Sequence, residues 1–222
     1  MEEKVYTYDT GEVTVTYDSR RCIHAEECVK GLQSVFNPNK RPWIQPEYAT
    51  PEEIKDVVHR CPTGALHVKR ANTGEEDQAI PARNTISVNP DGPIYFRGNI
   101  VVQSQEGDPV LQDSRFALCR CGASGNKPAC DNSHKKIDFS ASSHIPRAPF
   151  SSDRQQEKTG EGETLILKVM KNGPLLVEGS YQIYSTTSQP VNSSKTIALC
   201  RCGGSSDKPF CDGTHKEIGF NG

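Results

Sequence analysis

Nine cysteines dominate the chemistry that this sequence could perform, and they fall into three groups of three. Thiolates can bind metal ions, form disulfides or act as nucleophiles. The segment Met1–Lys4 is acidic and is not followed by an apolar run, so we expect no secretory signal and no disulfide-forming compartment. We therefore interpret the groups as metal sites rather than as disulfides or buried core cysteines. They are Cys22, Cys28 and Cys61; Cys119, Cys121 and Cys130; and Cys200, Cys202 and Cys211.

The second and third groups belong to an internal repeat. Shifting the chain by 81 positions places one group on the other. The ungapped alignment of 85–139 with 166–220 has 22 identities in 55 positions, which indicates a duplicated unit. Each copy also contributes one histidine, so each offers three thiolates and one imidazole. The two sets are Cys119, Cys121, Cys130 and His134, and Cys200, Cys202, Cys211 and His215.

The spacing within each set predicts how the ligands meet. The last cysteine and the histidine are four positions apart, so they share one face of a helix. Asp131 and Asp212 would be the N-caps of these short helices, whose free N–H groups would face an anionic metal centre. Zinc also binds three cysteines and one histidine. The Cys-x-Cys pair argues against zinc, because zinc sites typically place two to four residues between paired cysteines.

The complete motif resembles that of the CDGSH iron–sulfur family, the mitoNEET-like proteins. The second copy matches the family pattern Cys-x-Cys-x₂-Ser/Thr-x₃-Pro-x-Cys-Asp-Gly-Ser/Ala/Thr-His throughout. The first copy departs once, with Asn132 in place of glycine, and asparagine tolerates left-handed backbone angles. The resemblance covers roughly 85–139 and 164–220.

This resemblance implies one [2Fe–2S] cluster in each copy. The paired ligands would be Cys119 with Cys121 and Cys130 with His134 in the first copy, and Cys200 with Cys202 and Cys211 with His215 in the second. The family's clusters are redox-active and acid-labile, and the histidine ligand raises the potential. The family often forms two-fold dimers, so the two copies here could form a pseudo-dimer within one chain.

The first cysteine group has a different pattern. Cys22 and Cys28 keep the spacing of a bacterial ferredoxin motif, and Cys61-Pro62 supplies its distant Cys-Pro, but Ala25 stands at the middle position. The segment resembles the divergent mono-cluster ferredoxins, similar to those that serve bacterial cytochromes P450. The resemblance implies a [3Fe–4S] cluster, or a [4Fe–4S] cluster with a non-cysteine fourth ligand. His24 is one residue out of register and is better explained as a surface histidine; a domain without a cluster is the third possibility.

The surrounding sequence predicts small elements. In the N-terminal segment we expect strands at Val13–Tyr17 and Ala65–Lys69 and a helix at about 26–34. A second helix should begin with a Thr50–Glu53 capping box and stop at Pro62. The outline of this segment is therefore β-α-α-β. Each repeat should contain three short strands. A tight turn joins the first two, and a longer loop leads to the third strand, which delivers the first cysteine. The expected strands are 85–89, Ile94–Phe96 and Phe116–Leu118, and 164–170, Leu175–Val177 and Ile197–Leu199, with Gly98 and Gly179 ending the middle ones.

These elements predict an α+β chain: a small β-α-α-β ferredoxin-like domain followed by two mostly-β CDGSH domains in a possible intramolecular pseudo-dimer. The expected boundaries are 1–72, 84–139, a linker at 140–163 and 164–222. Hydrophobic residues make up only 34% of the chain and aromatic residues 7%, so metal rather than a large core should stabilise the domains. The net charge of −2 argues against nucleic-acid or membrane binding, and no apolar run could span a bilayer.

The sequence contains no defined catalytic motif, so we expect a non-enzymatic redox protein. It would transfer electrons through two [2Fe–2S] clusters and one [3Fe–4S] or [4Fe–4S] cluster, as a cytoplasmic monomer with internal pseudo-symmetry. Its partners would be redox proteins or, in a second role of cluster storage or transfer, apo-acceptor proteins. The same residues would also suit a sensor of redox state or pH, or a zinc-binding interaction module.

Overall fold

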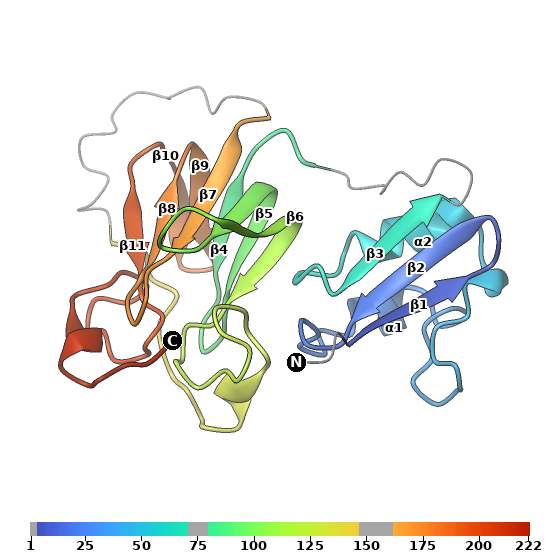
Figure 1. Cartoon of the computed structure of the whole chain (residues 1–222), viewed down its shortest axis with the longest axis horizontal. Coiled ribbons are helices and arrows are strands. Elements are labelled where there is room, and N and C mark those ends of the chain that lie inside the picture. Colours follow the sequence, from blue (N-terminus) through green and yellow to red (C-terminus); the bar gives the residue numbers. More distant parts are fainter. Residues whose placement is uncertain (1–3, 71–79, 147–161) are drawn as a thin grey trace. The chain divides into compact units, whose positions relative to one another are not determined.

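The computed structural model describes residues 4–70, 80–146 and 162–222 (Figure 1). The chain divides into two compact units, Met1–Ala79 and Ile80–Gly222. Each unit has a hydrophobic core of its own. None of the helices in the described ranges combines the length and the apolar character needed to cross a bilayer.

The first unit is built on a three-stranded antiparallel sheet in the order β1-β2-β3. Its elements are β1 (Val5–Asp9), β2 (Val13–Asp18), α1 (Glu27–Gly31), the 3₁₀ helix η1 (Pro46–Tyr48), α2 (Pro51–Val58) and β3 (Leu66–Arg70). The predicted order of strand, two helices and strand is present, but the prediction lacked β1. This edge strand exposes Val5 and Tyr6 by 47% and 51%, so it buries too little apolar surface to be recognised from its pattern.

The predicted capping box at the start of α2 is confirmed. Thr50 Oγ1 accepts a hydrogen bond from Glu53 N at 3.3 Å, and the Glu53 carboxylate accepts one from Thr50 N at 2.9 Å. The helix packs Ile54, Val57 and Val58 into the core. It ends at Val58, and Cys61 N donates to the Val58 carbonyl at 3.1 Å. The helix therefore fixes the start of the segment that carries Cys61.

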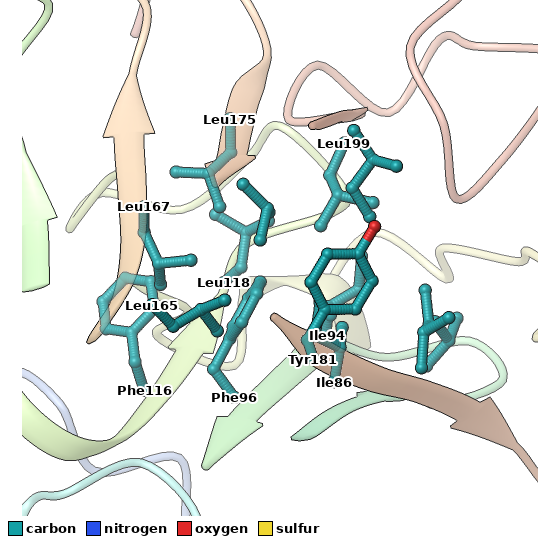
Figure 2. Close-up of a cluster of buried hydrophobic side chains, with 14 of the residues drawn as sticks. Ile86, Ile94, Phe96, Phe116, Leu118, Leu165, Leu167, Leu175, Tyr181 and Leu199 are labelled. Carbon is teal, nitrogen blue, oxygen red and sulfur yellow. The ribbon is translucent and has the colours of Figure 1, made fainter. Parts of the chain in front are cut away.

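The second unit contains a single eight-stranded sheet to which both repeats contribute. The first copy supplies β4 (Thr85–Val88), β5 (Ile94–Gln103) and β6 (Pro109–Leu118), and the second β7 (Thr164–Val169), β8 (Leu175–Glu178), β9 (Tyr181–Ser185), β10 (Ser188–Ser193) and β11 (Ile197–Leu199). The order is β10-β9-β4-β5-β7-β8-β11, with β6 paired to β5. Side chains from both copies fill its core, as Figure 2 shows for Phe96, Phe116, Leu165 and Tyr181.

The strand register relates the two copies by symmetry. The only parallel pairings in this sheet, among the described strands, are β5 with β7 and β4 with β9. Val101 lies opposite Ile166 in the first pairing, and Gln182 lies opposite Thr85 in the second. In the repeat, Val101 is equivalent to Gln182 and Thr85 is equivalent to Ile166, so the two parallel pairings are equivalent. Each copy therefore completes the sheet of the other copy.

Of the two middle strands, predicted to end at Gly98 and Gly179, only that of the first copy differs from the prediction. In the first copy β5 continues through Gly98, with an irregular register between Arg97 and Ile100. Gly98 has a φ of 154°, and a Cβ atom there would lie 2.0 Å from Asn84 Oδ1, so only glycine fits. In the second copy the strand does break at Gly179, between β8 and β9. The third strand of the first copy is longer than predicted, because β6 begins at Pro109. In the second copy β11 has the predicted bounds, and β10 is an additional strand before it.

Part of the predicted linker is packed against the second repeat. The Ile145 side chain is 3% exposed and belongs to the core of the second unit. Its amide donates to Ser188 Oγ at 2.8 Å, and the Ser143 and Thr187 hydroxyls lie 3.2 Å apart. One buried isoleucine within a polar stretch is enough to fix this segment. The rest of the predicted linker, up to 161, lies outside the described residues.

Candidate metal centres

The four predicted ligands of the first repeat lie together as two pairs. Cys119 Sγ and Cys121 Sγ are 3.7 Å apart. Cys130 Sγ and His134 Nδ1 are 3.4 Å apart. Cys119, Cys130 and His134 are buried, whereas Cys121 is partly exposed.

Backbone hydrogen bonds bring these two pairs together. Cys119 follows β6, and its amide donates to the Pro128 carbonyl at 2.9 Å. The Cys130 amide donates in the other direction, to the Ala117 carbonyl at 2.8 Å. This short antiparallel bridge places the third cysteine beside the end of the strand that delivers the first.

The second repeat has the same construction. Cys200 Sγ lies 3.7 Å from Cys202 Sγ, and Cys211 Sγ lies 3.3 Å from His215 Nδ1. The Cys200 amide donates to the Pro209 carbonyl at 2.9 Å, and the Cys211 amide donates to the Ala198 carbonyl at 2.8 Å. The structure therefore brings together both predicted sets of three cysteines and one histidine.

The aspartate of each motif has a different role from the predicted helix N-cap. The Asp131 carboxylate accepts hydrogen bonds from Gly125 N at 2.8 Å and from Ser133 N at 3.0 Å. It thus joins the loop after Cys121 to the turn that carries His134. Asp212 does the same with Ser206 N at 2.7 Å and Thr214 N at 3.0 Å. These bonds lower the pKa of the Asp212 carboxyl.

Each histidine lies on a single 3₁₀ turn rather than on an α-helix. The turns are η2 (Ser133–Lys135) and η4 (Thr214–Lys216). The residue before each turn is left-handed, with φ of 74° at Asn132 and 95° at Gly213. A left-handed residue cannot be part of the predicted helix, so the helix starts later and is shorter. Asn132 nevertheless adopts the conformation that glycine has in the second copy, as predicted.

The surroundings of the sulfurs suit a metal centre that carries negative charge. The Asn132 amide points to Cys130 Sγ at 3.5 Å, and the Gly204 amide points to Cys202 Sγ at 3.4 Å. Such N–H groups favour anionic sulfur. In the metal-free chain, burial raises the pKa of the Cys130 thiol to about 11, so this thiol holds its proton. Metal binding must displace that proton and is favoured by rising pH.

The pairing of the donors tests which metal group fits. A mononuclear zinc site requires four donors around one ion. Within the described ranges, no three Cys, His, Asp or Glu side chains gather closely enough to hold one metal ion. Two separate donor pairs in each repeat match a cluster in which each of two irons takes two protein ligands. The residues therefore fit an iron–sulfur cluster better than a single zinc ion.

The two sites lie next to each other in the second unit. Gly122 has a φ of 78°, and a Cβ atom there would lie 2.4 Å from the carbonyl oxygen of Cys202. Gly203 has a φ of 79°, and its Cβ would lie 2.5 Å from the carbonyl oxygen of Cys121. The backbones that follow the two Cys-x-Cys pairs are therefore in direct contact across the repeat, and only glycine permits this approach.

The three cysteines of the first unit line one cavity. It has a volume of about 600 Å³, and Cys22, Cys28 and Cys61 all border it. Cys22 lies in the loop after β2, Cys28 lies in the first turn of α1, and Cys61 lies after α2. One segment thus supplies Cys22 and Cys28, and a distant one supplies Cys61. The volume is within the usual range of ligand sites.

Packing of the two helices holds these segments together. A Cβ atom on Gly31, at the end of α1, would lie only 3.1 Å from Val57 Cγ2 on α2.

Burial raises the pKa of the Cys28 thiol to about 11, and the charge of the nearby Cys61 contributes. Thr63 Oγ1 lies 3.5 Å from Cys61 Sγ. Burial and a hydrogen bond to Cys22 raise the pKa of Tyr17, whose ring lies 4.9 Å from that of Trp43.

The position of the missing fourth cysteine has an unusual backbone. His24 and Glu26, on either side of Ala25, both have left-handed conformations, with φ of 53° and 62°. Such conformations cost about 1 kcal/mol or more each in residues with a side chain. Ala25 and His24 both border the cavity, and the His24 side chain is exposed. A strained loop therefore carries Ala25 at the border of the cavity that the three predicted cysteines line.

Sequence reasoning missed two residues of these sites, Arg120 and Arg201. They occupy the middle position of the two Cys-x-Cys pairs and are 1% and 2% exposed. A signal was available, because the variable position of the motif is arginine in both copies. An arginine in a short polar motif is normally exposed, so its burial was not expected.

Comparison with known proteins agrees with this division of the chain. Residues 8–71 match the family model described as "Divergent 4Fe-4S mono-cluster". Residues 91–135 and 172–216 each match the model described as "Iron-binding zinc finger CDGSH type". The curated relatives include the uncharacterized protein YjdI of Escherichia coli strain K12 and that of strain O157:H7. Each is 36% identical over 62 residues, which cover 28% of this chain and 82% of the relative. No solved structure matches.

Proposed function

Because the chain belongs to the CDGSH family of iron–sulfur proteins, with two tandem CDGSH domains behind a divergent mono-cluster domain, we propose that it is a non-enzymatic electron carrier. The observation that carries this proposal is the contact between Gly122 and the Cys202 carbonyl, with its counterpart at Gly203. Two metal sites in direct backbone contact can exchange an electron without movement of the chain. The shared sheet also supports an intramolecular pseudo-dimer, and hence a monomer.

The protein would hold three clusters. In each repeat the two donor pairs would bind the two irons of a [2Fe–2S] cluster, and the three cysteines of the first unit would bind a [3Fe–4S] or [4Fe–4S] cluster. Such clusters supply one-electron oxidation and reduction over a wide range of potentials. The ligands are Cys119, Cys121, Cys130 and His134; Cys200, Cys202, Cys211 and His215; and Cys22, Cys28 and Cys61.

The side chains around the repeat sites keep the donors in place. The Ser124 hydroxyl donates to the Ala129 carbonyl at 2.7 Å, and Ser205 makes the same bond to Phe210. Together with Asp131 and Asp212, they fix each ligand loop by backbone bonds that do not depend on the metal charge. A rigid donor set requires little rearrangement when an electron arrives, which suits a carrier. The exposed edges of the sites, at Cys121 and Cys202, would face the redox partner.

A redox titration of the purified protein tests this proposal. We expect reversible reduction with all visible absorption recovered on reoxidation. Replacing the neutral imidazole by a thiolate in His134→Cys or His215→Cys should lower the potential of one cluster and leave the other near its original value. Loss of the clusters on a single reduction cycle would contradict electron transfer. An unchanged potential in both variants would remove the histidines from the ligand set.

A second candidate function is delivery of a cluster to an acceptor protein. Cys211 and His215 are partly exposed, whereas Cys130 and His134 are 2% and 7% exposed. The second repeat is thus the more accessible of two otherwise matched sites. Mixing with an apo-ferredoxin as acceptor should then move iron and sulfide from the second repeat first. A carrier that keeps both clusters during this incubation would exclude delivery.

A further inference from the structure

Arg120 and Arg201 are buried cations that the ligand sets leave unexplained. Each lies between the first two cysteines of its repeat, and 81 positions separate them. Their exposures of 1% and 2% are far below those normal for arginine, which is rarely buried without a paired negative charge.

The hydrogen bonds of Arg120 all end on neutral acceptors, in its own repeat or in the segment that directly follows it. Its guanidinium donates to the carbonyls of Gly92 at 3.0 Å, Ser142 at 2.9 Å, Asn89 at 2.5 Å and Ala141 at 3.2 Å. It also lies 5.5 Å from the centre of the Phe139 ring. These contacts fix the group in space, but a carbonyl does not neutralise a positive charge.

Arg201 repeats this arrangement in the second copy. It donates to the carbonyls of Gly173 at 2.9 Å, Met170 at 2.7 Å and Gly222 at 2.9 Å. The Phe220 ring lies 5.4 Å away. Because the environment is reproduced at both positions, the burial of these arginines is a property of the repeat rather than an accident of one loop.

For each arginine, the cysteine whose ionised form would most strongly favour the protonated guanidinium belongs to the other repeat. Burial lowers the pKa of Arg120, and the opposing effects come from Cys200 of the second copy and then from Asp91. For Arg201, burial likewise lowers the pKa and is opposed first by Cys119 of the first copy and then by its neighbour Cys202. Arginine keeps its proton in both cases, so each site of the unit faces a permanent positive charge from its partner repeat.

Backbone contacts independently place the two segments against each other. Gly122 touches the Cys202 carbonyl and Gly203 touches the Cys121 carbonyl, and all four residues lie within two positions of the arginines. The two Cys-Arg-Cys-Gly segments therefore contact each other, so the segment that carries each arginine lies against a ligand-bearing segment of the other repeat.

We propose that Arg120 and Arg201 are reciprocal positioning residues: each sets the reduction potential of the metal site in the opposite repeat. This inference rests on the proposed function, because it concerns the potentials of the two clusters. A fixed positive charge in a buried site stabilises the more negative, reduced state and raises its potential. The effect should be larger at the opposite site than at the arginine's own site.

The test measures each cluster separately in the full-length protein. In the His134→Cys background the histidine-ligated cluster that remains is that of the second repeat, and in the His215→Cys background it is that of the first. The electron paramagnetic resonance of the reduced protein distinguishes the two ligand types. Arg120→Gln should lower the potential of the second cluster more than that of the first, and Arg201→Gln should do the reverse. The exchange of effects between two variants is a result that general destabilisation cannot produce.

Lys135→Gln is the matched control. Lys135 is exposed and follows His134, so removing its charge should lower the reduction potential of the first cluster only. The decrease should be smaller than in Arg201→Gln, because water screens the Lys135 charge. If a glutamine variant does not fold, Arg120→Lys and Arg201→Lys provide the same comparison. Lysine keeps the positive charge at a displaced position, so each lysine variant should lower the reduction potential of the cluster in the other repeat by a smaller amount than glutamine does.

Two results would overturn the inference. One is a larger shift at the arginine's own cluster, and the other is an equal shift at both clusters. Failure of the proposed function would look different, since a protein without visible clusters would give no potential at all.

Discussion

The two units of this chain build metal sites in opposite ways. In Ile80–Gly222 each ligand set lies within one short motif, and backbone bonds next to the cysteines bring the donors together. In Met1–Ala79 two thiols, Cys22 and Cys28, lie six positions apart, but the third, Cys61, lies 33 positions further along the chain. Helix packing brings Cys61 to the cavity that the other two border. The repeats therefore carry their sites as local structure, whereas the first unit forms its site only when its tertiary structure is complete.

The two units also differ in the structural feature that limits their metal sites. The repeat sites have a full set of four donors, and their weak point is the contact between the two copies. The first unit has an independent core but only three thiols, and its weak point is the strained loop around Ala25. Changes at these two places should therefore have different consequences.

The largest effect is expected at the contact between the repeats. Gly122→Ala places a Cβ atom 2.4 Å from a backbone oxygen of the other copy, at a positive φ. Overpacking and backbone strain together should destabilise the second unit by roughly 3 kcal/mol. Because both ligand segments meet there, we expect both CDGSH clusters to be lost together, as measured by visible absorption and iron content.

Gly125→Ala is the control for this variant. Its Cβ atom would meet the Asp131 carboxylate at an ordinary 3.6 Å, so both clusters should remain. Loss of only the first cluster in Gly122→Ala would show that the two sites are structurally independent.

The next effect concerns the missing ligand of the first unit. Ala25→Cys adds a thiol at the border of the cavity that Cys22, Cys28 and Cys61 already line. We expect a [4Fe–4S] cluster with four cysteine ligands, so the paramagnetic signal of an oxidised [3Fe–4S] cluster should disappear completely. If the original protein holds a [4Fe–4S] cluster, a chelator should instead remove the fourth iron more slowly from the variant than from the original protein.

Ala123→Cys adds a thiol to an exposed loop position of the first repeat and serves as the control. It should change neither the resonance spectrum nor the rate of iron loss. If Ala25→Cys behaves like this control, the cavity does not hold the cluster.

A smaller effect is expected from the capping box of α2. Thr50→Ala removes the side-chain acceptor of Glu53 N and should destabilise the first unit by about 1 kcal/mol. For a unit of this size, that corresponds to a midpoint about 4–8 °C lower. The chain has one tryptophan, Trp43, so its fluorescence follows the first unit alone. Cluster absorption of the second unit should melt at an unchanged temperature, and a common shift would mean that the two units unfold together.

The smallest effect is a pH dependence in the stability that the capping box of α2 gives to the first unit. Hydrogen bonds from Thr50 lower the pKa of the exposed Glu53 carboxyl below its usual value of 4.5. Its stabilising contribution is therefore complete above that value and is lost as the pH falls through the lower, folded-state pKa. Glu53→Gln should reduce the pH dependence of the Trp43 unfolding transition in this range. Equal slopes for variant and original protein would show that the carboxylate has no net effect.

Local features were predictable from the sequence, and non-local ones were not. The eight predicted ligands of the repeats and the capping box at Thr50 follow from short motifs. The structure places the eight side chains in four close pairs and confirms the capping box. The pairing of β5 with β7 joins residues more than sixty positions apart, and nothing in either strand specifies its partner. The passage of β5 through Gly98 depends on Asn84, another distant residue. Asp131 was predicted to cap a helix because Cys130 and His134 have helical spacing, but the left-handed Asn132 leaves room for only a single 3₁₀ turn.

Iron and acid-labile sulfide analysis of anaerobically purified protein, combined with electron paramagnetic resonance before and after reduction, tests the central claim most directly. The account predicts two [2Fe–2S] clusters that become paramagnetic on reduction, together with a third, larger cluster of distinct spectrum. A folded protein that is colourless and carries one zinc ion in each repeat would contradict it.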